Sequence, residues 1–424
     1  MSKSEKIKRS FIIIVIVIVA IISMYKAKER RLRRQQEKEN IVEKKEGFDN
    51  IGNYNVDLIK KFHELDNNKN YLISPYNIEL ALNMLRDGAE GNTLKELDNV
   101  LGKREINDVS VKDKIGIANT VFIKDEYKDN VKENYYETLK NKYNSEVIYD
   151  EFSKPDKINN WVKTKTNGMI DKILDQMNKD FVMGLASALA IDVKWQDQFN
   201  CNETKREQFT KIDNKKIDVE MMHKTFEMSD YKYFKNDDSE GIIIPYQKEE
   251  NSKVQLEFIG ILPNKSPDEY IKNLTKEKLD TLDKNQKKAS EKLHINLSLP
   301  RFKYDFEAKN FIDILKDIGI KDAFDQDKAN FKKMIEIEKY NVYVGEAIHK
   351  THIDLNEKGT KAAAITYFGM FKNSAMIEEE KYDTINIKFN RPFIYMIRDN
   401  NTKEILFFGT VYEPNIWQGT TCEG

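Results

Sequence analysis

The chain contains little cysteine, proline and histidine, and the shortage of cysteine excludes some classes of protein. Among its 424 residues are two cysteines, eight prolines and five histidines. Cys201 and Cys422 cannot form a disulfide framework or a four-thiolate zinc site, because both require more cysteines. A single bridge between them is feasible, but two free thiols are the favoured expectation, and the redox compartment stays open.

The chain also lacks a charge imbalance. Its 70 Lys and Arg residues nearly equal its 71 Asp and Glu residues, which leaves a net charge of -1. A nucleic-acid-binding protein needs a basic face, and no long Lys/Arg run occurs beyond residue 45, so we expect no nucleic-acid partner. With 40% hydrophobic residues the chain can bury a large core.

Short catalytic and cofactor motifs are missing as well. The chain has no G-x-S-x-G, no H-E-x-x-H and no G-x-x-x-x-G-K-[ST] sequence. His349 and His352 lie in a stretch that alternates like a strand, where side chains three apart face opposite sides and do not share a metal. We therefore expect neither a cofactor nor a metal site, and we do not expect an enzyme.

The N-terminus carries one long apolar run. Residues 1–9 form a basic flank, and the segment 10–25 contains fifteen consecutive uncharged residues, FIIIVIVIVAIISMY. Fifteen residues are fewer than the ~20 that span a bilayer core, although flanking Lys and Arg side chains extend the reach by snorkelling. The region after the run lacks the small residues of a cleavage site. An uncleaved transmembrane anchor is favoured, ahead of a signal peptide and a buried core element.

The charges around this run bear on its orientation. More basic residues follow it than precede it, and the positive-inside rule then favours a cytoplasmic location for the C-terminal side. Residues 26–45 are almost all charged or Gln and predict a solvated stalk. A globular domain is expected over 46–417, followed by a frayed tail at 418–424.

Hydrophobic periodicity places helices mainly in the first half of this domain and strands in the second. Helices are expected near 57–65, 75–88 and 94–101, a helix-turn-helix-like stretch at 157–174, and a single later helix near 310–319. Strands are expected near 71–74, 117–123, 145–152, 184–195, 240–246, 254–263, 292–306, 343–355, 384–399 and 405–414. Helices followed by sheets indicate one α+β domain rather than alternating βαβ units.

The segment NEKGTKAAAITYFGMF, residues 356–371, is unusual because small and apolar residues follow one another with no clear place in a core. As a strand with period two, it would place Thr360, Ala362, Ala364 and Thr366 on one side of a sheet. These side chains are small and uncharged, which suits burial under a covering layer. The other set begins with Lys361 and is expected to face solvent. No proline from residue 359 to 373 would remove a ladder donor.

Several stretches together resemble one family, the serpins, over about residues 50–415. The matching stretches, in family order, are LISPYNIELALNMLRDGAEGNTLKEL, INNWVKTKTNGMI, ASALAIDVKW, LPRFK, DAF, AIHKTHIDLNEKGTKAAAIT and NRPFIYMIRDNNTKEILFFGTVYEP. The resemblance implies a serpin fold, an α+β fold of three β-sheets and about nine helices with an exposed reactive-centre loop, here about residues 357–384.

The resemblance also implies a function. It predicts a suicide-substrate inhibitor of a serine protease, or alternatively of a cysteine protease. The loop is cut, the acyl-enzyme is trapped, and the loop inserts as a strand of the main sheet. A non-inhibitory serpin-fold binding protein is the alternative. The resemblance further implies a monomer, and family habit places the domain outside the cell, either membrane-anchored or secreted, against the charge count.

Site residues follow from the same resemblance. The hinge corresponds to Glu357, Lys358, Gly359, Thr360, Lys361, Ala362, Ala363, Ala364, Ile365 and Thr366. Seventeen residues counted from Glu357 give Asn373–Ser374 as the scissile bond. A loop one residue shorter gives Lys372–Asn373, which suits a trypsin-like protease, and Phe371 would suit a chymotrypsin-like pocket. Residues 378–384 make the segment after the bond longer than is usual.

Two internal regions of the family, the breach and the shutter, map onto five residues. Trp195 corresponds to the breach tryptophan, while Ser74, Asn77, Ser187 and His349 correspond to the shutter. Asn77 stands where the family usually has Ser, and Ser187 stands where Asn is usual. Both changes keep a hydrogen-bonding side chain, so a rewired network that includes His349 is expected.

Overall fold

A computed structural model describes residues 53–102, 106–111, 113–177, 182–227, 230–250, 252–308, 310–338, 341–360 and 382–419. The chain divides into two units, residues 1–50 and residues 51–424. The expected basic flank, apolar segment and stalk lie outside the described residues and stay predictions. Among the described residues, no helix is both long enough and apolar enough to cross a membrane.

The described part of the chain contains eight α-helices and three short 3-10 helices. The α-helices are α2 (Asn53–Leu65), α3 (Pro75–Gly88), α4 (Gly91–Leu101), α5 (Glu133–Tyr143), α6 (Asp156–Lys165), α7 (Pro267–Lys272), α8 (Lys276–Thr281) and α9 (Phe311–Asp317). The 3-10 helices are η1 (Asp125–Asn130), η2 (Cys201–Glu203) and η3 (Asp322–Phe324).

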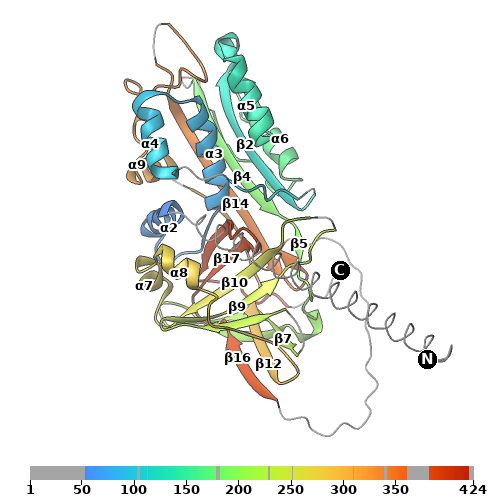
Figure 1. The fold of residues 1–424 in the computed structure, drawn as a ribbon. Coiled ribbons are helices and arrows are strands. Elements are labelled where there is room, and N and C mark those ends of the chain that lie inside the picture. Colours follow the sequence, from blue (N-terminus) through green and yellow to red (C-terminus); the bar gives the residue numbers. More distant parts are fainter. Residues whose placement is uncertain are drawn as a thin grey trace, which may run out of the picture. The chain divides into compact units, whose positions relative to one another are not determined.

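The strands form three sheets, as expected (Figure 1). The core sheet has the order β1-β18-β17-β10-β9-β8-β11 and consists of Tyr71–Ile73, Ile405–Val411, Phe393–Asp399, Leu256–Pro263, Ser239–Pro245, Lys232–Lys235 and Gln286–Lys288. The small sheet has the order β16-β12-β7-β6 and consists of Asp383–Lys388, Leu293–Pro300, Lys216–Phe226 and Lys205–Thr210.

The third sheet, which we call the hinge sheet, positions the candidate site. Its order is β3-β2-β4-β14-β15-β5, and β13 pairs with the other edge of β14. These strands are Val147–Asp150, Ile115–Lys124, Met183–Ile191, Val344–Asn356, Gly359–Thr360, Val193–Lys194 and, for β13, Phe302–Glu307. At its centre β4 and β14 pair directly and in parallel, from Val344 opposite Met183 to Thr351 opposite Leu189.

Hydrophobic clusters cover both faces of the hinge sheet. One face contributes Leu185, Leu189 and Ile353 to the main core, which also contains side chains of the core sheet. The other face carries Ala186, Ala188, Ala190 and Ile348, which pack with α6 and the segment after it in a second cluster. The sheet is therefore buried on both sides along β4, in agreement with its nearly uncharged sequence.

Local signals in the sequence explain several element boundaries. The Ser74 side chain accepts a hydrogen bond from the Asn77 N–H, and Pro75 follows at the first helical position, so α3 begins there. Of the helix-turn-helix-like stretch expected at 157–174, the first helix and the turn are confirmed, but the second helix is wrong, because α6 ends at Lys165 and an irregular segment follows the turn.

The expectation of a single helix in the second half of the domain is also wrong. The short helices α7 and α8 lie there together with α9. Each has six residues and begins at a side-chain cap, Ser266 for α7 and Thr275 for α8. Helices of that length carry too few turns for a periodic apolar pattern to be visible.

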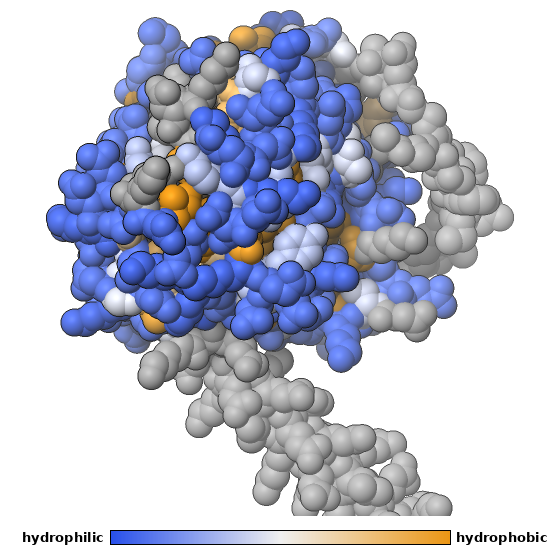
Figure 2. Space-filling view, turned by 90° about the horizontal axis from the view of Figure 1, so that it is seen from above, coloured by the Kyte–Doolittle hydropathy of each residue, from blue (hydrophilic) through white to orange (hydrophobic). Residues whose placement is uncertain are grey.

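Cys201 is disulfide-bonded, so the expectation of two free thiols is wrong. Its neighbourhood is polar, as is most of the surface. In the face shown in Figure 2, hydrophilic side chains predominate and the hydrophobic ones occur in small patches. That surface agrees with a chain in which 33% of the residues are charged.

Candidate functional site

The chain reverses direction at the end of β14 and starts a new strand. β14 ends at Asn356, residues 357–358 form a turn, and β15 then pairs antiparallel with two strands at once. Gly359 lies opposite Asn356 of β14 and Lys194 of β5, and Thr360 lies opposite Leu355 and Val193. The first two residues after the turn are thus already inside the hinge sheet.

Gly359 is required by this geometry. Its φ of +153° is a conformation that residues with a side chain rarely adopt. A Cβ at this position would lie 2.0 Å from the backbone oxygen of Val193 and 2.7 Å from the Cα of Lys194. Glycine therefore allows β15 to approach β5 closely.

Trp195 holds the turn from the side of β5. Its indole Nε1 donates to the backbone oxygen of Asn356 at 2.8 Å, and its backbone N–H donates to the oxygen of Lys358 at 2.9 Å. The ring is fully buried and stacks on Tyr246, with 4.6 Å between centroids and 7° between planes. The tyrosine hydroxyl in turn lies 2.7 Å from Oγ1 of Thr360.

Glu357, in the turn itself, is a buried carboxylate with a complete set of partners. Arg301 Nε contacts both of its oxygens at 2.8 Å, and the Thr204 hydroxyl donates to Oε1. The Glu357 backbone oxygen accepts from the N–H of Phe199 at 2.9 Å. Arg301 also contacts Glu220 of β7 at 3.1 Å, so the ion pair joins the hinge sheet to the small sheet.

The expected shutter residues converge below the turn, between β4, β14 and the start of α3. Ser187 of β4 lies directly opposite His349 of β14, and both side chains are fully buried. His349 Nε2 accepts from the backbone N–H of Ser74 at 3.1 Å, so its Nδ1 carries the proton and faces Ser187 Oγ at 3.4 Å. Burial lowers the pKa of His349 to about 3, and the ring is neutral.

Asn77 completes this network. The sequence predicted such a network because Asn77 and Ser187 each keep a hydrogen-bonding side chain where the family usually has Ser and Asn. Its side-chain amide donates to Ser187 Oγ at 2.8 Å, and its carbonyl oxygen accepts from the amide of Asn119 at 2.7 Å. Three strands and a helix are therefore linked through buried polar side chains at the line where β4 and β14 meet. Such a network favours one arrangement of these elements, because separated members would lose buried partners.

Sequence reasoning missed the partners that hold the turn. Arg301 and Tyr246 were not singled out, and neither were Thr204, Glu220 and Asn119. Arg301 precedes Glu357 by 56 positions, and no local pattern marks a contact of that kind. Arg301 lies inside the single strand expected over 292–306, so the break between β12 and β13 that exposes its role was not visible in the sequence.

Several predicted site residues lie outside the described residues. They are the hinge residues Lys361, Ala362, Ala363, Ala364, Ile365 and Thr366 and the reactive-bond residues Lys372, Asn373 and Ser374. His349 and His352 lie on opposite faces of β14, as expected. His352 is partly exposed and contacts Asp305 at 2.8 Å, and no cluster of possible metal ligands occurs among the described residues.

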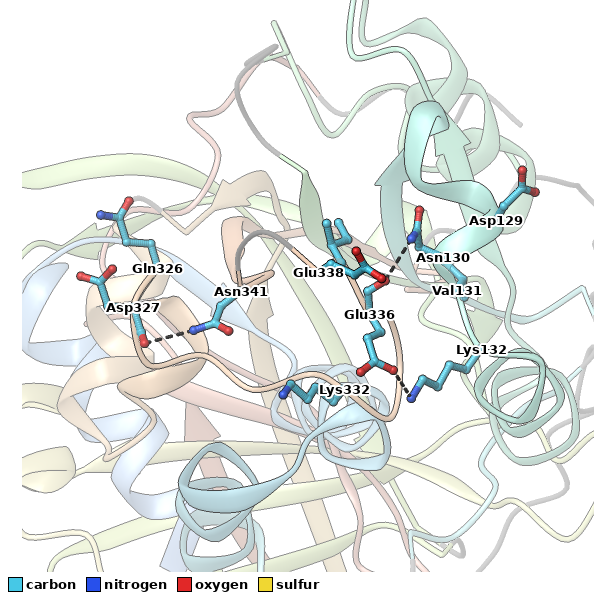
Figure 3. A pocket seen from close by; sticks show the side chains of 11 residues that line it. Asp129, Asn130, Val131, Lys132, Gln326, Asp327, Lys332, Glu336, Glu338 and Asn341 are labelled. Atoms are coloured by element: carbon cyan, nitrogen blue, oxygen red, sulfur yellow. Dashed lines mark hydrogen bonds and ion pairs between the residues drawn. The ribbon is translucent and has the colours of Figure 1, made fainter.

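One surface hollow, of about 1100 Å³, lies beyond the other end of β14 (Figure 3). Its lining is polar and internally paired. Lys132 contacts Glu336 at 2.9 Å, and Asn341 donates to the backbone oxygen of Asp327 at 3.1 Å. These residues precede Val344, whereas the hinge follows Asn356 at the far end of the strand, so the hollow is separate from the candidate site.

Comparison with known proteins identifies the family. The family model described as serpin (serine protease inhibitor) matches residues 49–414. This chain belongs to the serpin family. Serpins are generally inhibitors of proteases rather than enzymes. The three-sheet α+β fold agrees with membership of this family.

Relatives and solved structures support the same family. The serpin is 29% identical to an uncharacterized serpin-like protein of Thermococcus kodakarensis, over 86% of this chain and 85% of the relative. It is 29% identical to the leukocyte elastase inhibitor of Equus caballus, over 85% and 97% of the two chains. The crystal structure of the thermophilic serpin tengpin in its native state has a TM-score of 0.74 and 32% identity, over 87% and 94%. Thyroxine-binding globulin in complex with thyroxine shares the fold, with a TM-score of 0.71 and 22% identity over 87% and 99%.

Proposed function

We propose that this serpin is a suicide-substrate inhibitor of a serine protease or, alternatively, of a cysteine protease. A protease cuts the loop after the hinge, and the N-terminal part of the loop then inserts between β4 and β14 while the acyl-enzyme is still intact. The observation that carries the proposal is the pairing of β15 with both β14 and β5, above a directly paired β4 and β14.

The register of β15 supports a specific position for the inserted strand. Continued in the same register, Ala362 comes opposite Ile353 and Ile191, and Ala364 comes opposite Thr351 and Leu189. All four of these partners are buried. Opposite residues of antiparallel strands share a face, so the small set of the loop would enter the main core, where little room is available.

Thr366 would then lie between the two central shutter residues. The same register places it opposite both His349 and Ser187, which now face each other directly. Its hydroxyl can replace part of the Ser187–His349 contact that insertion separates. The buried polar groups would therefore keep a partner after the sheet opens, which supports a loop built to insert.

In this register the other set of loop side chains would not face solvent, in contrast to the prediction from the sequence. Lys361 would lie opposite Asp354 and Asp192, where its ammonium group meets two carboxylates. Ile365, further along, would lie opposite Ala188, on the face that packs with α6. Insertion thus requires α6 and the segment after it to move away from the sheet. The alanines of β4 leave space beneath them.

The energetics favour insertion once the loop is cut. A new central strand adds on the order of ten ladder hydrogen bonds at about 1 kcal/mol net each, which is comparable with the ~5–15 kcal/mol stability of a domain. It also exchanges one parallel pairing for two antiparallel ones, which are slightly more stable per residue. The uncut protein must then be held by a kinetic barrier, to which the β4–β14 ladder and the shutter contribute.

The specificity of the inhibitor depends on residues that the structure does not describe. The candidate bonds remain Asn373–Ser374 and Lys372–Asn373, with Phe371 as a third site of cleavage. The domain is proposed to lie outside the cell, behind an N-terminal anchor or a cleaved signal, and to act as a monomer. Thyroxine-binding globulin shows that the fold also serves binding, so a non-inhibitory binding protein is the alternative.

The test is to incubate the full-length chain with a panel of trypsin-like, chymotrypsin-like and Asn-specific proteases. Inhibition predicts a covalent complex that survives denaturing electrophoresis under reducing conditions, together with a C-terminal fragment whose first residue identifies the bond. Insertion predicts a higher melting temperature for the cleaved protein than for the intact one. If the panel cuts the loop, releases active protease and leaves the melting temperature unchanged, the binding alternative is correct.

A further inference from the structure

The disulfide at Cys201 has a single candidate partner within the chain. Cys201 is disulfide-bonded, and Cys422 is the one other cysteine in the sequence. Cys201 opens η2, the turn between β5 and β6, and Cys422 lies in the C-terminal tail outside the described residues. The described residues before the tail show whether it can reach the turn.

The C-terminal segment contacts β7 before the described chain ends. After β18 ends, the Asn415 side chain accepts from the backbone N–H of Lys303, and Ile416 forms an isolated bridge with Val219. Trp417 then donates its backbone N–H to the oxygen of Asp218 at 2.8 Å. The last part of the described chain is therefore fastened to the start of β7.

A tail that turns back after Trp417 is long enough to reach the turn. Lys205, four residues after Cys201, pairs with Met221, which lies three residues from Asp218 along β7. η2 itself packs against β7. Three strand residues span roughly 10 Å, and the five residues from Trp417 to Cys422 reach about 17 Å when extended.

We propose that Cys201 and Cys422 form a bridge that keeps the C-terminal part of the chain covalently attached after the loop is cut. Every candidate scissile bond, from Phe371 to Ser374, lies between the two cysteines in sequence. The 51 residues from Ser374 to Gly424 would otherwise be held only by packing, chiefly of β17 and β18 in the core sheet. With the bridge, cleavage opens the loop without producing a separable fragment.

Formation of the bridge is an oxidation that fits one kind of compartment. Two thiols lose two protons and two electrons, which pass by thiol–disulfide exchange to the disulfide of an oxidoreductase or of a small-molecule oxidant. Such bridges persist in oxidising surroundings and are rare in a reducing cytosol. The bridge thus supports an extracytoplasmic location for the domain, against the count of basic residues around the apolar segment.

The bridge also lies next to the turn that carries the hinge. Thr204, which donates to the Glu357 carboxylate, follows directly after η2, and Phe199, which donates to the Glu357 backbone, precedes it by two residues. A tail tied to Cys201 is therefore held beside the contacts that start the inserted strand. Reduction releases the tail without removing any of these contacts, so the folded domain is expected to survive it.

The pairing is tested by tryptic peptide mapping of the full-length chain without reductant. The expected result is one cross-linked species that joins the peptide of residues 195–205 to that of residues 404–424 and separates on reduction. Alkylation of the unreduced, denatured protein is expected to label neither cysteine. Two labelled thiols, or a disulfide-linked dimer of two chains, would overturn the proposal.

Retention of the fragment is tested with loop-cut protein on denaturing gels. Without reductant the cut chain is expected to migrate as one species, and with reductant as two. The Cys201→Ser and Cys422→Ser variants are expected to give two species in both conditions. A free fragment from the unreduced wild-type chain would refute retention. This result is independent of inhibition, because any protease that cuts within residues 361–381 reports on the bridge, whether or not it is trapped.

Discussion

The buried Glu357 carboxylate and the partly buried Arg301 guanidinium form an ion pair in which Nε lies 2.8 Å from each carboxylate oxygen. The two residues come from the hinge turn and from the junction between β12 and β13, so a single contact joins the base of the loop to a second sheet. Because Arg301 also contacts Glu220, one cation offsets two buried carboxylates. The pair therefore controls the stability of the turn from which insertion starts.

Arg301→Ala is expected to destabilise the uncut protein by about 3–5 kcal/mol, since it leaves buried carboxylates without their cation. Denaturant unfolding monitored by the fluorescence of the buried Trp195 measures the loss. Lys303→Ala is the matched control, because Lys303 is largely exposed and its contact with Asp354 is worth at most about 1 kcal/mol. Equal effects of the two variants would contradict the role given to Arg301.

Gly359→Ala is expected to expel β15 from its place between β14 and β5. The added Cβ would lie 2.0 Å from the Val193 oxygen, and the φ of +153° adds strain of about 1–3 kcal/mol. Loss of the Thr360–Tyr246 contact should follow, with faster hydrogen exchange at the backbone amides of residues 359 and 360. Gly102→Ala is the control. Gly102 also has a positive φ, but a Cβ there would contact nothing, so this variant reports the backbone strain without the clash.

Thr360→Arg is expected to convert the inhibitor into a substrate. Thr360 is buried and faces the Tyr246 hydroxyl, so a guanidinium there opposes entry of the loop into the core. The number of inhibitor molecules cut per molecule of protease trapped should rise at least tenfold. Lys361→Arg is the control, because that side chain would lie beside Asp192 and Asp354 on the other face. Unchanged trapping by Thr360→Arg would contradict the inserted register.

Acid is expected to weaken the shutter. His349 has its folded-state pKa lowered to about 3 by burial, whereas an unfolded histidine has about 6.5. Below pH 6.5 the unfolded chain therefore binds a proton that the folded chain does not, so stability falls as the pH decreases from 6.5 toward 3. Between pH 6.5 and pH 5 the loss is about 2 kcal/mol.

His349→Gln isolates this effect from the titration of other groups. Unfolding free energies of the two proteins, measured from pH 7.5 to pH 5, should differ in slope by about one proton below pH 6.5. The variant is less stable throughout because it loses the Ser74 and Ser187 contacts. Parallel stability curves would show that His349 is not the titrating group.

The glycine at the turn could be predicted from residues 356–371 because the relevant information is local, whereas the strand beyond Thr360 lies outside the described residues and stays a prediction. Alternation of small side chains, the glycine at the turn and the absence of proline follow from period two and backbone geometry. The partners of the turn could not be predicted in this way, because Arg301, Tyr246 and Thr204 reach it through tertiary contacts that span 56, 114 and 153 positions. The nearly uncharged sequence of β4 indicated a strand buried on both faces, but it did not indicate that α6 is the element that covers the second face.

Because Thr360 is fixed opposite Leu355 and Val193, the two ends of the loop differ in how well they tolerate a change in length. A residue added or removed between 360 and 366 would shift the strand by one position and turn its small side chains toward α6 and its large ones toward the core. A change beyond residue 367 would leave these positions in place. Variation in loop length and sequence should therefore accumulate beyond residue 367, where it alters the choice of protease without disturbing the inserted strand.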